Sequence, residues 1–124
     1  MSTMIQVTEP TMVLNEEVCK SNIARMAAKA KAANVVFRPH FKTHQSREIG
    51  EWFRASGVDK ITVSSLNMAM KFAEWGWNDI TVAFPVNCLE HEKINALAAK
   101  IRLNLFVFVY LWVAKKPDIF GLFA

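Results

Sequence analysis

Cysteine is scarce in this sequence of 124 residues, which contains only Cys19 and Cys88, neither of them in a CxxC pair. Zinc sites and disulfide frameworks depend on closely spaced cysteines, so we expect neither here. The opening segment MSTMIQVTEP lacks the basic and apolar regions of a secretory signal. The sequence therefore predicts a cytoplasmic protein with reduced thiols.

Several functional motifs are also missing. The chain has no GxGxxG, GxxxxGK[ST] or GxSxG segment. It therefore lacks the usual signatures of dinucleotide binding, phosphate-loop binding and serine hydrolysis. Basic residues outnumber acidic ones by 15 to 11, but no basic run exceeds two residues. The acid-free stretch between Glu17 and Glu48 suits a solvated helix face, with an anion-binding module as a weaker alternative. We expect no nucleic-acid partner.

A membrane-spanning run is absent as well. The longest apolar segment, LNLFVFVYLWVA at residues 103–114, has about 12 residues, whereas a spanning helix needs about 20. Its valine and aromatic content favours a buried strand or an aggregation-prone tail. We therefore expect no membrane partner.

The composition is that of a folded domain. Hydrophobic residues make up 52% of the chain and charged residues 21%, which argues against disorder. The length suits one modest domain, and it is too short for a complete α/β barrel of roughly 250 residues.

Short β-like runs alternate with segments of helical periodicity. Strands are predicted at residues 11–14, 35–37, 60–65, 79–84 and from about 103, and helices at 15–34, 48–57, 68–76 and 90–100. Asn15 is a favourable helix N-cap, and Asn34, Gly57 and Gly76 are expected helix ends. This order predicts an α/β fold with a parallel sheet and right-handed crossovers.

The segment RPHFKTHQS at residues 38–46 carries the most chemistry. It follows a predicted parallel strand, at the carboxyl end where α/β folds bind ligands. Arg38 and the apolar strand residues would disfavour the ammonium form of Lys42, and a neutral amine is what Schiff-base chemistry requires. If the strand continued, His40, Lys42 and His44 would share one face. The alternative is a strand-end lysine that simply points to water.

A metal site within this chain is not expected. The spacing of His40 and His44 matches a two-ligand pattern on a helix, but Pro39 opposes a helix there. No third ligand is evident in the sequence, and a site needs at least three.

These residues resemble a known family. From about Glu9 to Leu105 the chain is similar to the N-terminal part of the D-threonine aldolase and D-serine dehydratase-like enzymes, which use pyridoxal phosphate on an alanine-racemase-type barrel (fold type III). The matching pieces are TEPTMVLNEE, SNIARMA, PHFKTH, ITVSSLNMA and DITVAFPVN. The resemblance implies that residues 1–105 form the N-terminal half of the barrel. The expected fold is thus a partial (β/α)8 TIM barrel of about four βα units and a fifth strand.

The resemblance also implies a function. Lys42 corresponds to the lysine that forms the internal aldimine with pyridoxal phosphate, and His40, His44 and Ser65 are expected to line the cofactor site by position. The implied activity is that of a lyase on a small D-amino acid bearing a β-hydroxyl, of D-threonine aldolase or D-serine dehydratase type. Full-length relatives use a divalent metal, whose ligands would lie beyond residue 124, and are usually homodimeric.

Two alternatives stay open. Residues 106–124 are unlike the family, which predicts an apolar tail on a truncated chain, and such a chain could be a catalytically inactive fragment. An alanine racemase-like isomerase is the other alternative. Racemases, however, carry a tyrosine four residues after the lysine, where this chain has Ser46.

Overall fold

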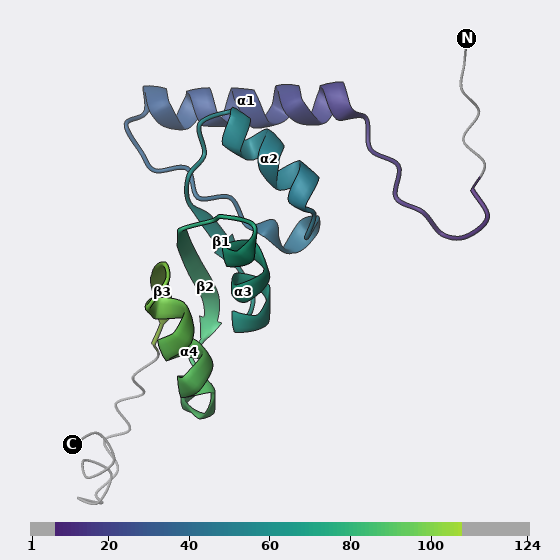
Figure 1. Ribbon diagram of the computed structural model, residues 1–124. Coiled ribbons are helices and arrows are strands. Elements are labelled where there is room, and N and C mark those ends of the chain that lie inside the picture. The colour runs from purple at the N-terminus through teal and green to yellow at the C-terminus, as the bar shows by residue number, and fades with distance from the viewer. Residues whose placement is uncertain (1–6, 108–124) are drawn as a thin grey trace, which may run out of the picture.

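The computed structural model describes residues 7–107, in which three helical elements precede the first strand and helices and strands alternate after it (Figure 1). The elements are α1 (Glu16–Ala32), the 3-10 helix η1 (Phe41–Thr43), α2 (Arg47–Ala55), β1 (Ile61–Val63), α3 (Leu66–Glu74), β2 (Asp79–Pro85), the 3-10 helix η2 (Cys88–Glu90), α4 (His91–Ala98) and β3 (Arg102–Phe106).

The three strands form one parallel sheet in the order β1-β2-β3, as the sequence predicts. Ile61 pairs in register with Ile80, and Val82 with Leu105. The register shifts between Val82 and Pro85, where β2 ends. α3 contacts β1 and β2, α4 contacts β3, and the two helices contact each other beside the sheet (Figure 1).

The two faces of the sheet differ in character. Ile61, Val63, Ile80 and Val82 are buried and form the core with residues of α3, with Phe41 and with Trp77. Because side chains alternate along a strand, the residues between them point to the opposite face. That face carries polar side chains at matching register positions: Thr62, Thr81 and Asn104.

Local signals explain the helix boundaries. The side chain of Asn15 accepts a hydrogen bond from the Val18 N–H at 3.0 Å and begins α1, as predicted. Asn34 lies just past α1 in the left-handed region, with φ of 54°. Gly57 and Gly76 follow α2 and α3 with φ of 82° and 86°, conformations that glycine adopts without steric cost.

Two predicted strands are wrong. Residues 11–14 and 35–37 are not strands; Met12 and Val36 are 79% and 68% exposed. The second segment reaches the sheet at one parallel bridge, between His40 and Thr62. Pro39 has no N–H to donate to a ladder, which limits pairing there. The strand expected from about residue 103 is confirmed as β3.

Two further expectations concern the apolar C-terminal segment. Among residues 7–107, none of the helices combines the length and apolar character that crossing a bilayer demands. The predicted tail at residues 106–124 lies outside the described residues, apart from its first two positions.

Candidate functional site

The candidate residues His40, Lys42, His44 and Ser65 all lie on segments joined to β1. The Thr62 N–H of β1 donates to the Pro39 carbonyl at 2.8 Å, and η1 follows directly and contacts β1. Ser65 follows the end of β1. In parallel α/β folds the carboxyl edge of the sheet is where ligands bind.

A cavity of about 360 Å³ opens at this edge. Its lining includes Ser64 and Ser65 after β1, Phe84 and Asn87 at and after the end of β2, and Leu105 of β3. His40, Lys42 and His44 are not part of that lining. Of the candidate residues, the cavity therefore takes in Ser65, while the other three lie on the segment bridged to β1.

The shared face expected for His40, Lys42 and His44 is wrong. Phe41–Thr43 form a 3-10 turn rather than a strand, and residues two apart in such a turn point in different directions. The turn sets Phe41 into the core with no exposed surface. Phe41 thereby anchors Lys42, its neighbour in sequence.

His40 caps this turn. Its Nδ1 accepts a hydrogen bond from the backbone N–H of Lys42 at 3.1 Å. Partial burial lowers the pKa of His40, and the nearby charge of Lys42 lowers it further, so both favour neutral imidazole. In that form Nε2 carries the proton, because Nδ1 is the acceptor. His40 thus has one ring nitrogen committed to the turn and one N–H to donate.

His44 anchors the other end of the turn. Its ring lies edge-on to Phe41 at 4.4 Å and nearly parallel to Phe53 at 5.7 Å. Its Nε2 is buried without a hydrogen-bond partner in the described part of the chain. Burial lowers the pKa of His44, which favours the uncharged ring against these aromatic neighbours.

Lys42 itself is exposed, and its ammonium forms no ion pair or hydrogen bond within residues 7–107. The burial expected from the sequence is therefore not provided by this part of the chain. The expected repulsion from Arg38 is also wrong, because Arg38 is paired with Asp79 at 2.7 Å. What the described chain offers at Lys42 is an accessible primary amine on an anchored turn.

Ser65 has a structural task. Its Oγ accepts a hydrogen bond from the Met68 N–H at 3.2 Å and so caps α3. Its hydroxyl hydrogen remains available to a ligand in the adjoining cavity.

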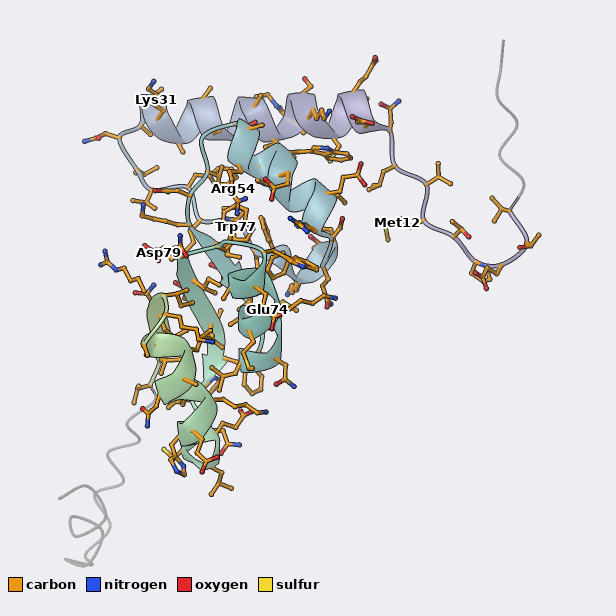
Figure 2. The ribbon with its side chains drawn as sticks, viewed as in Figure 1. Met12, Lys31, Arg54, Glu74, Trp77 and Asp79 are labelled. Atoms are coloured by element: carbon orange, nitrogen blue, oxygen red, sulfur yellow. The ribbon has the colours of Figure 1, made fainter. Side chains whose placement is uncertain are left out.

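Sequence reasoning missed a polar network on the face of the sheet opposite the core. The Asp79 carboxylate accepts from Arg38 Nη1 at 2.7 Å and from Asn104 Nδ2 at 3.0 Å, and Arg102 Nε lies 3.9 Å away. Asp79 begins β2, and Figure 2 places it at the end of the sheet nearer α2. Burial raises the pKa of Asp79, but Arg38, Asn104 and Arg102 outweigh it and leave that pKa lowered. The available signal was a polar residue in each of two apolar strands, since such residues need partners.

Metal ligands do not gather in this part of the protein. Among residues 7–107, no three histidine, cysteine, aspartate or glutamate side chains are grouped closely enough to hold an ion.

Comparison with characterised proteins gives independent evidence about the family that the chain resembles. No model of a protein family matches the chain. It is, however, 35% identical over 100 residues to D-threo-3-hydroxyaspartate dehydratase of Delftia sp. strain HT23. That alignment covers 81% of this chain but 26% of the dehydratase, so the chain spans about a quarter of that enzyme's length.

Solved structures agree. The structure of the same dehydratase matches with a TM-score of 0.69 and 34% identity, over 73% of this chain and 24% of that one. D-threonine aldolase from Filomicrobium marinum matches in fold, with a TM-score of 0.70 at 24% identity over 75% of this chain and 26% of the aldolase. An alanine racemase-like protein from Idiomarina loihiensis gives 0.66 at 26% identity, over 76% of this chain and 26% of that one.

These matches confirm the resemblance predicted from the sequence. The chain is similar in sequence to D-threo-3-hydroxyaspartate dehydratase and to an alanine racemase-like protein, and it shares its fold with D-threonine aldolase. The predicted fold class is likewise confirmed: the chain is an α/β unit with a small parallel sheet that matches part of the (β/α)8 barrel of alanine racemase-like enzymes.

Proposed function

Because its homologues include a D-hydroxyamino acid dehydratase, we propose that this chain is part of a pyridoxal phosphate-dependent lyase that acts on D-amino acids with a β-hydroxyl group. Lys42 is the residue that we assign to the cofactor. The observation that carries the proposal is the 35% identity over 100 residues to D-threo-3-hydroxyaspartate dehydratase. The alignment spans about a quarter of that dehydratase, so the proposed activity is that of an enzyme of the dehydratase's length.

The residues present fit this cofactor. Pyridoxal phosphate is held through an aldehyde, which needs an accessible amine, and the exposed amine of Lys42 has no competing ion pair among the described residues. When bound, the cofactor serves as the electron sink for bonds broken next to the amino group of the substrate. The protein's part is to bind and orient the reacting groups.

The residues around Lys42 have separable tasks in this proposal. Phe41 and His44 hold the turn against the core, so the amine projects from a fixed backbone. His40 accepts from the Lys42 N–H through Nδ1 and offers its Nε2–H to an anionic or carbonyl group of the ligand. Ser64 and Ser65, after β1, offer hydroxyl groups from the wall of the cavity of about 360 Å³.

A binding experiment tests the assignment of Lys42. The purified chain is mixed with pyridoxal phosphate, and the absorbance change of imine formation is recorded for the wild type and for Lys42→Met. The matched control is Lys29→Met, which removes an exposed lysine of α1 that has no ion pair in the described structure. We expect loss of the signal in Lys42→Met alone. A folded wild-type chain without the signal would support the alternative of an inactive fragment.

The products separate the two lyase reactions. Dehydration of a β-hydroxy D-amino acid eliminates water, and hydrolysis of the resulting imine takes up one water to give a 2-keto acid and ammonia. Aldol cleavage of the same substrate gives glycine and an aldehyde. Since the higher identity is to the dehydratase, we favour dehydration. Detection of keto acid and ammonia from D-threo-3-hydroxyaspartate by the full-length enzyme would support this choice, and glycine as the product would reverse it.

An isomerase remains the second candidate, favoured by the likeness to an alanine racemase-like protein at 26% identity. Ser46 occupies the position four residues after Lys42, and its Oγ accepts from the Ile49 N–H at 3.3 Å to begin α2. A serine hydroxyl used as a helix cap is a poor proton donor compared with a phenol. Racemisation of D-alanine by the full-length enzyme would establish this candidate instead.

A further inference from the structure

The segment that leads to Lys42 is weakly attached to the sheet through its backbone. Residues 35–39 are not strand, and the single bridge joins His40 to Thr62. Pro39 contributes a carbonyl to the bond from the Thr62 N–H, but it has no N–H to return. A register held by so few ladder bonds is poorly specified by the backbone alone.

The side chain of Arg38 makes the cross-strand bonds that the backbone lacks. Its Nη1 approaches the Ile61 carbonyl of β1 and the Asp79 carbonyl of β2, each at 3.3 Å. The same atom donates to the Asp79 carboxylate at 2.7 Å. One guanidinium four residues before Lys42 therefore ties this segment to two strands.

The network extends across the sheet. Asn104 of β3 donates to the Asp79 carboxylate at 3.0 Å and contacts the Ile80 carbonyl at 3.4 Å. Arg38 and Asp79 are largely shielded from water, with side-chain exposures of 24% and 13%. An ion pair in this setting is screened less by salt than an exposed one.

The aromatic anchor and the polar network constrain different directions. Phe41 packs among Phe53, Phe72 and Trp77, at ring distances of 5.1 to 5.2 Å, and sets how deeply the turn sits. Because hydrophobic packing is non-directional, these contacts do not fix the position of the segment along β1. Hydrogen bonds to specific carbonyls are directional and do fix the position along β1 and β2.

We propose that Arg38 is a positioning residue: its bonds to Asp79 and to the carbonyls of β1 and β2 set the register of the segment that carries Lys42. The consequence for cofactor binding rests on the function proposed above. The consequence for the backbone does not, because it concerns only the attachment of residues 38–44 to the sheet.

The test compares Arg38→Met with Arg38→Lys and with the matched control Arg47→Met. Arg47 is exposed, lies five residues after Lys42, and makes no hydrogen bond or ion pair within the described chain. Two quantities are measured on the full chain: amide hydrogen exchange at residues 40–44 and 62, and the rate at which pyridoxal phosphate is captured covalently at Lys42 after borohydride reduction.

We expect Arg38→Met to speed exchange at these amides by about tenfold or more, the effect of losing a charge-assisted hydrogen bond. Exchange at α3 and β2 amides should change less, and capture at Lys42 should slow. Arg38→Lys, which keeps a cation with several donors, should recover part of both effects, and Arg47→Met should resemble the wild type.

The outcomes separate the two proposals. Unchanged exchange at residues 40–44 in folded Arg38→Met overturns the positioning role, whatever the capture rate is. If the wild type captures no pyridoxal phosphate at Lys42 but exchange still rises in Arg38→Met, the proposed function fails and the attachment stands. Should Arg38→Met not fold because the Asp79 carboxylate is left unpaired, the variant with both Arg38→Met and Asp79→Asn replaces it.

Discussion

Residues 7–36 and residues 37–106 both contain large apolar side chains but pack very differently, and the aromatic residues of the described chain all lie in the second region. In the first region Ile23 alone is buried, and large apolar residues such as Met12, Val18 and Val36 are mostly exposed. The second region contains the remaining core residues around the sheet. Figure 2 shows Met12 on an extended arm well away from Trp77 and Asp79.

The difference shows that burial depends on a partner surface, not on hydrophobicity alone. Helix α1 contacts α2, and Lys20 lies over the ring of Trp52 at 5.3 Å. Other apolar residues of α1 stay partly in solvent, such as Met26, which is 45% exposed. Substitutions in the two regions should therefore have unequal effects. The first three comparisons pair a change in one region with a change in the other, and the fourth compares two histidines of residues 37–106.

The largest difference should come from truncating apolar side chains. Phe41→Ala removes a fully buried ring and should lower the free energy of unfolding by about 3–5 kcal/mol. Met12→Ala removes a side chain that is 79% exposed and should change it by less than about 0.5 kcal/mol. Urea denaturation measures both, and similar losses in the two variants would contradict the division into regions.

The next difference concerns acidic side chains and pH. Asp79→Asn should cost about 1.5–3 kcal/mol at neutral pH, because it removes the charged acceptor of Arg38. The pKa of Asp79 is lowered by folding, so this stability is present above the ordinary value of 3.8 and is lost as the pH falls through the lower folded value.

Wild type and Asp79→Asn should therefore converge in stability under acid conditions, as measured by unfolding at a series of pH values. Glu17→Gln is the control from α1, where the carboxylate is exposed and forms no ion pair in the described structure. It should follow the wild-type profile. A gap between wild type and Asp79→Asn that does not narrow in acid would refute the assignment.

Removing a helix N-cap should affect the two regions differently, although each cap contributes about 1 kcal/mol to helix stability. Ser65→Ala and Asn15→Ala each remove one side-chain acceptor at a helix start, a change that typically costs about 1 kcal/mol. Ser65→Ala should lower global stability, because α3 is part of the core. Asn15→Ala should instead speed hydrogen exchange in α1 and leave global unfolding almost unchanged. A global loss in Asn15→Ala would mean that α1 unfolds together with the sheet.

The smallest predicted effect is the pH dependence due to His44. Folding lowers its pKa from the ordinary value of 6.5, so its contribution to stability is present above that pH and is lost as the pH falls further. His44→Phe should remove this loss of stability, so that the pH dependence that remains in this range is the part due to His40. His91→Phe, which changes an exposed histidine of α4, should retain the wild-type dependence. Unfolding curves between pH 7 and 5 decide between these outcomes.

Helices were predictable because their signals are local. The cap at Asn15 and the stops at Gly57 and Gly76 lie within or next to the helices that they delimit. Strands need partners distant in the sequence, which explains why residues 60–65 and 79–84 were assigned correctly but 11–14 were not. A run of apolar β-branched residues indicates that a segment can form a strand. It does not show whether another strand lies beside it to pair with.

The site was predictable in part. The PHFKTH segment singles out Lys42 only through its resemblance to a family, and that assignment stays a prediction. The strand expected before it is absent, and one bridge between His40 and Thr62 joins this segment to the sheet. The 3-10 turn was not foreseen, because it depends on burial of Phe41 in a core assembled from later elements. The pairing of Arg38 with Asp79 spans 41 positions, and no spacing rule connects residues so far apart.

The account depends most on Lys42 as the cofactor lysine. The most direct measurement is to incubate the chain with pyridoxal phosphate, reduce it with borohydride and map the modified lysine by peptide mass spectrometry. The account predicts modification concentrated at Lys42 at low cofactor concentration, with exposed lysines such as Lys29 and Lys31 modified far less. Even modification of all exposed lysines, or preference for a lysine other than Lys42 in the folded chain, would contradict it.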